Sequence, residues 1–204
     1  MISLLKLKRL DLHPNPIMQF NAWFAEAKAE KSIDKPEAFC LSTVDKDGFP
    51  EGRILLLKTV DKGGFVFFTN KESDKGKALL NNPKASINFF WDQLGRQVRI
   101  QGEVCEVTSN ESDDYFHSRH RMSQIGARVS KQSQELKSKL TLIENFYQEK
   151  MVSGDVIERP EYWVGFRLIP RKIEFWVDCD FRLHDRFKYT KDNNNNWQID
   201  RLYP

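Results

Sequence analysis

Residues 38–69 read AFCLSTVDKDGFPEGRILLLKTVDKGGFVFFT. Three runs in this stretch are rich in β-branched and aromatic residues: AFCLSTV (38–44), GRILLLKTV (52–60) and FVFFT (65–69). The tetrapeptides DKDG (45–48) and DKGG (61–64) separate the runs, and Asp–Gly or Gly–Gly pairs are typical of tight hairpin turns. The stretch therefore predicts three antiparallel strands that follow one another directly.

Further strand signals lie on the C-terminal side of this stretch. KASINFFW (84–91) and RQVRIQGEVCEVT (96–108) flank a turn at residues 92–95, and Val98 and Ile100 alternate with polar neighbours, as in a strand with one solvated face. The last two strands of the chain are expected to form a hairpin whose tip lies at residues 193–196. Four later runs also read as strands: YWVGFRLI (162–169), KIEFWV (172–177), FRLHDRFKY (181–189) and WQIDRLY (197–203).

Helix signals interrupt the strands in four places. Asn15–Pro16 is typical of a helix start, Ser73 can cap a short helix that runs to Leu80, and Thr108 with Glu111 fits a capping box for a helix to about Ser118. A longer amphipathic helix is indicated by Leu136, Leu140, Ile143, Phe146 and Tyr147. Strand and helix do not alternate regularly, which disfavours a doubly wound parallel sheet. We expect one mainly β domain over residues 1–204, an antiparallel barrel with an N-terminal helix at about 16–30, a helical insertion at about 109–150 and C-terminal strands at about 162–204.

Composition excludes several classes of protein. The chain has 204 residues, 40% of them hydrophobic, and 32 basic against 29 acidic side chains give a net charge of +3. This balance argues against a nucleic-acid binder. Three cysteines are too few and too scattered for a disulfide scaffold or a zinc site. No apolar run reaches the roughly 18 residues of a membrane span, and the opening MISLLKLKRLDLHPNP lacks a signal-peptide core, so we expect a cytoplasmic protein.

The clearest candidate for chemistry is RLHDR (182–186). On a strand, residues two apart share a face, so Arg182, His184 and Arg186 are expected to project together, opposite to Leu183 and Asp185. Three potential cations on one face repel one another unless an anion lies among them. The alternative is a solvated edge strand, but two arginines around a histidine favour a phosphorylated ligand.

Two other clusters are weaker. Residues 119–134 contain four basic side chains and no acid, and this basic stretch is either a surface loop or a second phosphate contact. Arg53 and Lys58 are five apart, so in a regular strand they point to opposite faces and could grip different parts of a ligand. No GxGxxG, P-loop, CxxC or HExxH motif is present, and the four histidines have no metal-site spacing.

Taken together, these motifs resemble the pyridoxamine 5′-phosphate oxidase family over nearly the whole chain. The matching segments keep their order and spacing: RILLLK (53–58), FFTN (67–70), RQVR (96–99), YFHSR (115–119), SQIGA (123–127), SKQS (130–133), IEFW (173–176) and RLHDR (182–186). The resemblance implies an antiparallel, Greek-key-like split β-barrel that binds FMN at the interface of a homodimer. It also implies oxidation of pyridoxamine or pyridoxine 5′-phosphate to pyridoxal 5′-phosphate, with O2 reduced to H2O2.

The resemblance further implies a role for each matching residue. The FMN phosphate would be held by Arg53 and Lys75, and the flavin would be lined by Arg53, Ile54, Leu55, Leu56, Leu57 and Lys58 with Phe68 and Thr69. The FMN site would be completed, in part from the partner subunit, by Gln97, Gln132, Ser133, Trp176 and Arg186. The substrate phosphate would be bound by Lys58, Tyr115, Arg119 and Ser123. Arg182 and His184 would lie over the pyridine ring and assist proton movement. All of these groups are expected to converge on one cleft.

The chain departs from the family pattern at several positions. Asp74 stands where the family usually has Arg, and a carboxylate beside a phosphate is repulsive. We expect Asp74 to face solvent, Lys75 and Lys77 to hold the phosphate, and FMN to bind less tightly than is typical. The other departures affect substrate-site detail: His120 for Pro, Arg128 for Trp, Val177 for Gln and Val164 for Gly.

Two alternatives stay open. A related flavin split-barrel oxidase, such as those of phenazine biosynthesis, would act on another substrate, although the retained Tyr115, Arg119, Ser123 and RLHDR argue against it. A non-catalytic protein that stores or delivers FMN or pyridoxal phosphate would be consistent with Asp74 and Arg128. The vitamer preference, the FMN affinity and a second pyridoxal phosphate site do not follow from the sequence.

Overall fold

The computed structural model describes residues 11–61, 63–192 and 194–204. Residues 1–10, which include most of the apolar opening segment, lie outside this range, as do Lys62 and Asn193. The helices are α1 (Pro16–Ala29), α2 (Asp74–Asn81), α3 (Ser109–Ser118), α4 (Arg121–Val129) and α5 (Lys139–Val152). The strands are β1 (Ala38–Val44), β2 (Pro50–Leu56), β3 (Thr59–Asp61), β4 (Gly64–Asn70), β5 (Lys84–Trp91), β6 (Arg96–Glu106), β7 (Trp163–Val177), β8 (Asp185–Lys191) and β9 (Trp197–Leu202).

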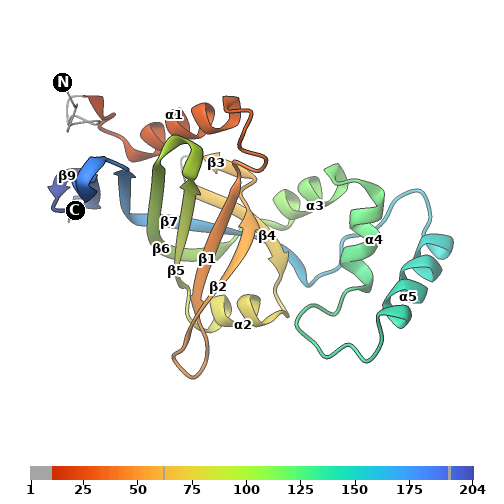
Figure 1. Ribbon diagram of the computed structural model, residues 1–204. Helices are drawn as coiled ribbons and strands as arrows, with labels where there is room; N and C mark the ends of the chain where they lie inside the picture. The colour runs from red at the N-terminus through yellow and green to blue at the C-terminus, as the bar shows by residue number, and fades with distance from the viewer. Residues whose placement is uncertain (1–10, 62, 193) are drawn as a thin grey trace.

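The strands form one curled sheet in which every pairing is antiparallel (Figure 1). The order is β2-β1-β5-β6-β7-β4-β3, and β8 and β9 extend the sheet from the C-terminal half of β7. The predicted antiparallel barrel is therefore confirmed. The sequence-adjacent strands β1 and β2 form a hairpin as expected, whereas β4 pairs with β7, about a hundred residues further along the chain.

Aromatic side chains fill the inside of the curled sheet. Phe20 of α1 is fully buried and lies within 4.9 to 6.1 Å of the rings of Phe65, Phe89 and Trp91. α1 can cover this end of the barrel because Asn15 caps it at the predicted position, accepting the backbone N–H of Ile17 at 2.8 Å. Burial of such rings is the main source of stability of the barrel.

Two predicted strand boundaries are wrong. The runs YWVGFRLI and KIEFWV belong to the single strand β7, which continues through Pro170 because the register shifts between Gln101 and Gly102. Gly102 is required there, since a Cβ would lie 2.0 Å from the carbonyl oxygen of Ile169. The run GRILLLKTV divides into β2 and β3 on either side of Leu57 and Lys58.

The third error concerns RLHDR. β8 begins only at Asp185, because Phe181 and Arg182 have φ values of 57° and 62°, which are incompatible with a strand. Arg182 therefore ends a short 3₁₀ turn (Asp180–Arg182) and does not share a strand face with His184 and Arg186. The predicted opposite face is confirmed for Asp185, which is buried.

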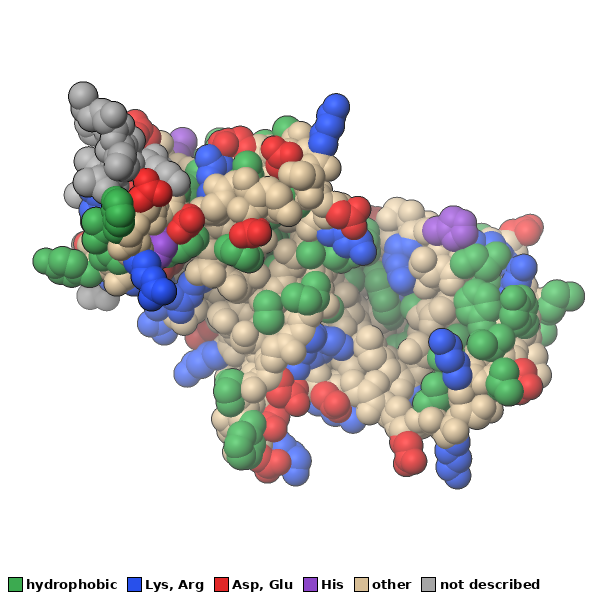
Figure 2. Space-filling model, in the orientation of Figure 1, with side chains coloured by type: hydrophobic (Ala, Val, Ile, Leu, Met, Phe, Trp, Pro, Cys, Tyr) green, Lys and Arg blue, Asp and Glu red, His purple; other side chains and the backbone are tan. Residues whose placement is uncertain are grey.

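The helices α3, α4 and α5 form a layer beside the barrel, at the end away from the C-terminus (Figure 1). α3 starts at the predicted capping box of Thr108 and Glu111, whereas α4 lies within the stretch that could also have been a basic surface loop. α5 begins at Lys139, after Leu136, and none of its residues is buried. Figure 2 shows hydrophobic side chains gathered at this end of the molecule. No described helix is long and apolar enough to cross a membrane.

Candidate functional site

Two cations from distant parts of the chain line one cavity of about 640 Å³. We call it the cationic cavity; it is lined by Glu51, Gly52, Arg53, Ile54 and Leu55 of β2, Asp74 and Lys75 of α2, and Gln132 and Ser133. Arg53 points into it because its strand pairs with β1, and its Nη1 donates to Thr43 Oγ1 at 2.6 Å. The other guanidinium nitrogen pairs with Glu51 at 2.6 Å.

Lys75 is held in this cavity by the start of α2. Its Nζ donates to Ser73 Oγ at 2.9 Å and to Gln132 Oε1 at 2.7 Å, and Ser73 also caps the helix. Burial, assisted by the positive charge of Arg53, lowers the pKa of Lys75 to about 8. A phosphate dianion beside Lys75 and Arg53 would stabilise the charged ammonium and offset the repulsion between the two cations. The donor set therefore fits a phosphate group.

The predicted solvent exposure of Asp74 is observed, although this residue also lines the cavity. Its backbone N–H donates to Ser133 Oγ at 3.3 Å. Lys77 is exposed one helical turn on and does not line the cavity, because its position lies on the opposite side of α2 from the buried Lys75. The expected second phosphate contact through Lys77 is therefore not supported by the geometry.

A second group of predicted residues surrounds three stacked rings. Phe68 of β4 packs against Tyr115 of α3 and Trp163 of β7, with centroid distances of 4.2 and 5.2 Å, and the Tyr115 and Trp163 rings are 6.0 Å apart. We call these three rings the aromatic stack. Arg119 extends over Trp163 at 4.8 Å, and Lys58 Nζ lies 5.7 Å from the centre of Tyr115. A cation above an aromatic face is held by the ring, and its N–H groups stay free to donate hydrogen bonds to a ligand.

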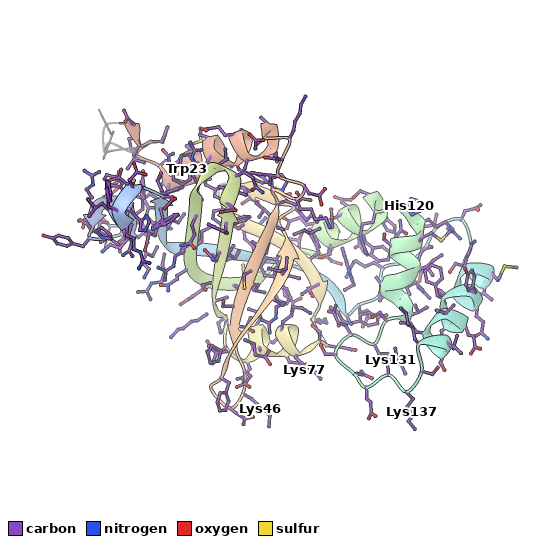
Figure 3. The ribbon with its side chains drawn as sticks, in the orientation of Figure 1. Trp23, Lys46, Lys77, His120, Lys131 and Lys137 are labelled. Carbon is purple, nitrogen blue, oxygen red and sulfur yellow. The ribbon has the colours of Figure 1, made fainter. Side chains whose placement is uncertain are left out.

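Arg119 is the most unusual cation of the described residues. Its Nη1 is buried and has no hydrogen-bond partner, and burial lowers the pKa of its guanidinium. A buried polar atom without a partner is costly, so the half-buried Arg119 side chain has a donor that an anion would satisfy. Ser123, in the first turn of α4, is exposed, and its backbone N–H donates to the carbonyl of His120, the residue at the corner between α3 and α4 (Figure 3).

The third group lies at the C-terminal end of β7; we call Trp176, Arg182, His184 and Arg186 the C-terminal cluster. The rings of Trp176 and His184 are 4.6 Å apart, and Nδ1 of His184 lies 3.1 Å from Asp178 Oδ1. Arg186 donates to Glu174 at 2.9 Å and to the carbonyl of Tyr203 at 2.9 Å. Arg182 is exposed.

The remaining predicted residues are divided among these places. Gln97 pairs with Trp176 across β6 and β7 and is half-buried. Thr69 is buried, with its hydroxyl 3.5 Å from Gln132 Oε1. Ile54 is 66% exposed, Leu55 and Leu56 are half-buried, and Leu57 belongs to the hydrophobic core. The Leu57 side chain is therefore not accessible to a ligand, which could contact this residue only through its backbone.

Within a single chain the predicted residues lie in separate places, and the shared cleft, expected to include residues of a partner subunit, stays a prediction. Arg53 lines the cationic cavity, whereas His184 lines another cavity, beside the end of β9. β9, which pairs with β8 beside the C-terminal cluster, and α3–α4 lie at opposite ends of the molecule (Figure 1). β7 runs between the two groups, and its 15 residues span about 45 Å along the strand.

This arrangement of sheet, cations and rings agrees with the comparisons to known proteins. The family model "Pyridoxamine 5'-phosphate oxidase" matches residues 25–146, and "Pyridoxine 5'-phosphate oxidase C-terminal dimerisation region" matches residues 163–204. The chain belongs to the pyridoxamine 5′-phosphate oxidase family. The C-terminal cluster thus lies in a segment that family members use for dimerisation, and the family supports flavin-dependent oxidoreduction in a homodimer.

Relatives in the family cover nearly the whole chain. The pyridoxine/pyridoxamine 5′-phosphate oxidase of Paraburkholderia xenovorans is 46% identical over 95% of this chain and 91% of its own length. The one of Nostoc sp. is 44% identical over 97% of this chain and 92% of its own length. Among solved structures, PhzG from Burkholderia lata, in complex with tetrahydrophenazine-1-carboxylic acid, has a TM-score of 0.92 and 29% identity over 100% of this chain and 99% of its own. A related FMN-binding protein from Nostoc punctiforme, at 16% identity over 95% of this chain and all of its own, has a TM-score of 0.78 and supports the split-barrel fold alone.

Two contributors to the site were not identified from the sequence. Trp163 is buried, stacks on Phe68 and holds Arg119 over its ring. Thr43 fixes Arg53 and is 99% buried. No local pattern marks either residue, because both act through partners far away in the sequence. The departures Val164 and Val177 are buried in the core, and His120 caps α4 through Nδ1.

Proposed function

We propose that this protein oxidises pyridoxamine 5′-phosphate or pyridoxine 5′-phosphate to pyridoxal 5′-phosphate, using FMN and O2, in vitamin B6 metabolism. The observation that carries the proposal is the 44–46% identity, over nearly the full chain, to relatives named pyridoxine/pyridoxamine 5′-phosphate oxidase. The predicted cytoplasmic location stays a prediction.

The cationic cavity would hold the FMN phosphate. Arg53 and Lys75 supply charge, and Gln132 and Ser133 line the same cavity beside Lys75 and Asp74. Residues Ile54–Lys58 with Phe68 and Thr69 would then line the flavin, and Gln97, Trp176 and Arg186 would complete its site. FMN, when bound, supplies the chemistry of accepting a hydride and passing two electrons to O2.

Arg119 and its neighbours would bind the substrate phosphate. The unpaired Nη1 of Arg119 offers a charge-assisted hydrogen bond, and Lys58, Tyr115 and Ser123 provide further donors beside it. Placing the phosphate there fixes the substrate ring near the aromatic stack, and such positioning accounts for much of the rate that the protein itself contributes.

Arg182 and His184 would act from the partner subunit of a homodimer. Within a chain Arg119 lies over Trp163, the first residue of β7, whereas Arg182 and His184 follow its last residue, so a second copy would bring them over the substrate ring. His184 can orient the ring and exchange a proton at its imidazole, while Asp178 beside Nδ1 holds the imidazole in place.

A related oxidase with another substrate is the second candidate. It is favoured by the TM-score of 0.92 to PhzG, whose structure was solved in complex with tetrahydrophenazine-1-carboxylic acid. The third candidate is a non-catalytic carrier of FMN or pyridoxal phosphate. It would bind its ligand in the same cavity but would not turn over substrate.

A spectrum of the purified protein, followed by anaerobic addition of substrate, tests the proposal. We expect flavin absorbance that bleaches on adding pyridoxamine phosphate, and H2O2 formation when air is admitted. Bleaching by tetrahydrophenazine-1-carboxylic acid but not by B6 vitamers would support the second candidate. A yellow protein that neither bleaches nor forms H2O2 would support the carrier.

A further inference from the structure

The connection between α4 and α5, residues 130–138, carries two groups that line the cationic cavity. Gln132 Oε1 accepts from Lys75 Nζ at 2.7 Å, and Ser133 Oγ accepts from the backbone N–H of Asp74 at 3.3 Å. Both side chains are exposed, and Ser133 has a φ of 70°, in the left-handed region that non-glycine residues adopt only where their surroundings hold them. The position of this connection therefore needs a structural cause.

Arg128, next to last in α4, supplies one such restraint. Its Nε donates to Glu149 Oε1 at 2.6 Å, and its Nη1 donates to the carbonyl of Glu158 at 3.1 Å. The hydroxyl of Ser153 donates to the same carboxylate oxygen of Glu149 at 3.0 Å. One guanidinium thus joins the end of α4 to α5 and to the segment that leads into β7.

Tyr162 restrains the same helix end from the other side. Its hydroxyl donates to the carbonyl of Arg128 at 2.7 Å, and its own carbonyl accepts from the backbone N–H of Lys71 at 2.7 Å. Burial raises the pKa of Tyr162, which keeps the phenol protonated and able to donate. Lys71 lies three residues before α2, so the last turn of α4 is connected to the element that carries Lys75.

A cavity of about 740 Å³ lies behind the connection, and its walls include Arg128, Glu149 and Tyr162. Ser130, Lys131 and Gln134 line this cavity, so the contacts of Arg128 and Tyr162 at the start of the connection help to determine where it lies. We propose that Arg128 is a positioning residue for FMN: it anchors the end of α4 so that Gln132 and Ser133 meet the phosphate. The proposal rests on the proposed function, because it takes FMN as the ligand of the cationic cavity.

FMN titrations of Arg128→Leu test the proposal. We expect affinity to fall about 5- to 20-fold, because the residue restrains two phosphate contacts without making one itself. Arg128→Lys keeps the charge but cannot make both hydrogen bonds, so an intermediate loss is expected, and this variant serves if Arg128→Leu does not fold. Lys137→Leu is the matched control: it removes one charge from the same connection, where Lys137 points away from the molecule (Figure 3), and affinity should change less than about twofold.

A double-mutant cycle separates positioning from general destabilisation. If Arg128 acts through Gln132, adding Arg128→Leu to Gln132→Ala should weaken FMN binding by less than about twofold more. Fully additive losses, or unchanged affinity in Arg128→Leu, would overturn the proposal. A melting temperature measured for each variant shows whether the fold is intact.

Limited trypsin digestion of the FMN-free protein gives a readout that does not depend on the cofactor. Cleavage after Lys131, followed by mass spectrometry, should be several-fold faster in Arg128→Leu than in the wild type or in Lys137→Leu. Unchanged cleavage would contradict the anchoring role. Wild-type protein that fails to bind FMN would refute the proposed cofactor and with it the role toward FMN, and the digestion would still show whether Arg128 anchors the connection.

Discussion

The two ends of β7 present cations in opposite ways. At the helical end, Arg119 has a buried nitrogen with no partner among the described residues, whereas at the C-terminal end Arg186 is neutralised by Glu174 and His184 lies against Asp178. A guanidinium with an unpaired buried nitrogen can bind an external anion, whereas the side chain of a cation that is paired with an acid is held in one orientation. The difference indicates that the helical end provides binding energy and the C-terminal end provides orientation.

Removing the unpaired cation should give the largest effect. We expect Arg119→Leu to raise the KM for pyridoxamine phosphate about 100-fold, since a charge-assisted contact contributes roughly 1.5–3 kcal/mol and substrate misplacement adds to the loss. FMN affinity should stay within about twofold, as measured by flavin fluorescence. Equal losses for FMN and substrate would remove the distinction between the cationic cavity and the aromatic stack.

Mixing two variants with raised KM, assayed at low substrate concentration, tests whether the two ends meet across the dimer. Arg119→Leu and Arg182→Leu subunits, denatured together at equal amounts and refolded, should recover about a quarter of wild-type activity, since half the dimers are mixed and each mixed dimer has one intact site. Arg182→Leu alone should raise KM and retain its flavin absorbance. No recovery from mixed dimers, checked by mass, would show that each site is built from one chain.

The cationic cavity is intermediate between the two ends of β7. Arg53 forms an ion pair with Glu51, whereas Lys75 donates to Gln132 and has no ion pair among the described residues. The pKa of Lys75 is lowered to about 8, so its positive charge is lost as pH rises through this value in the FMN-free protein. FMN affinity should therefore fall above pH 8, by at most about tenfold per pH unit. Lys75→Arg should remove this dependence, and an unchanged slope in titrations from pH 7 to 9.5 would show that Lys75 does not titrate there.

The smallest expected effect comes from reversing the charge of Asp74. Asp74→Arg should tighten FMN binding about three- to tenfold, because it removes repulsion beside the phosphate, although a base in the first turn of α2 costs about 0.3–1 kcal/mol of helix stability. Glu72→Arg makes the same change outside the cavity and should have little effect. Weaker binding in Asp74→Arg would contradict the predicted role of Asp74.

Local chemistry accounts for the elements that the sequence predicts well. Asn15, Ser73 and Thr108 cap helices where expected, and alternation in β6 matches its buried face, because these signals act within a few residues. The strand over RLHDR fails because nothing local shows that Phe181 and Arg182 adopt positive φ. Motif matching predicted the site residues, but their division between two ends depends on strand pairings more than 90 residues apart, such as Thr69 with Val164.

The uninterrupted run of β7 from Trp163 to Val177 has a consequence for substrate range. Antiparallel pairing with β4, β6 and β8 holds this strand along its length, so each chain keeps the two predicted groups of residues at a fixed separation. If the proposed site forms between two chains, the space above the flavin depends on how the chains dock, and a slight rotation at their contact would widen it for a tricyclic molecule or narrow it for a single ring. New specificities could therefore arise through mutations far from any ligand.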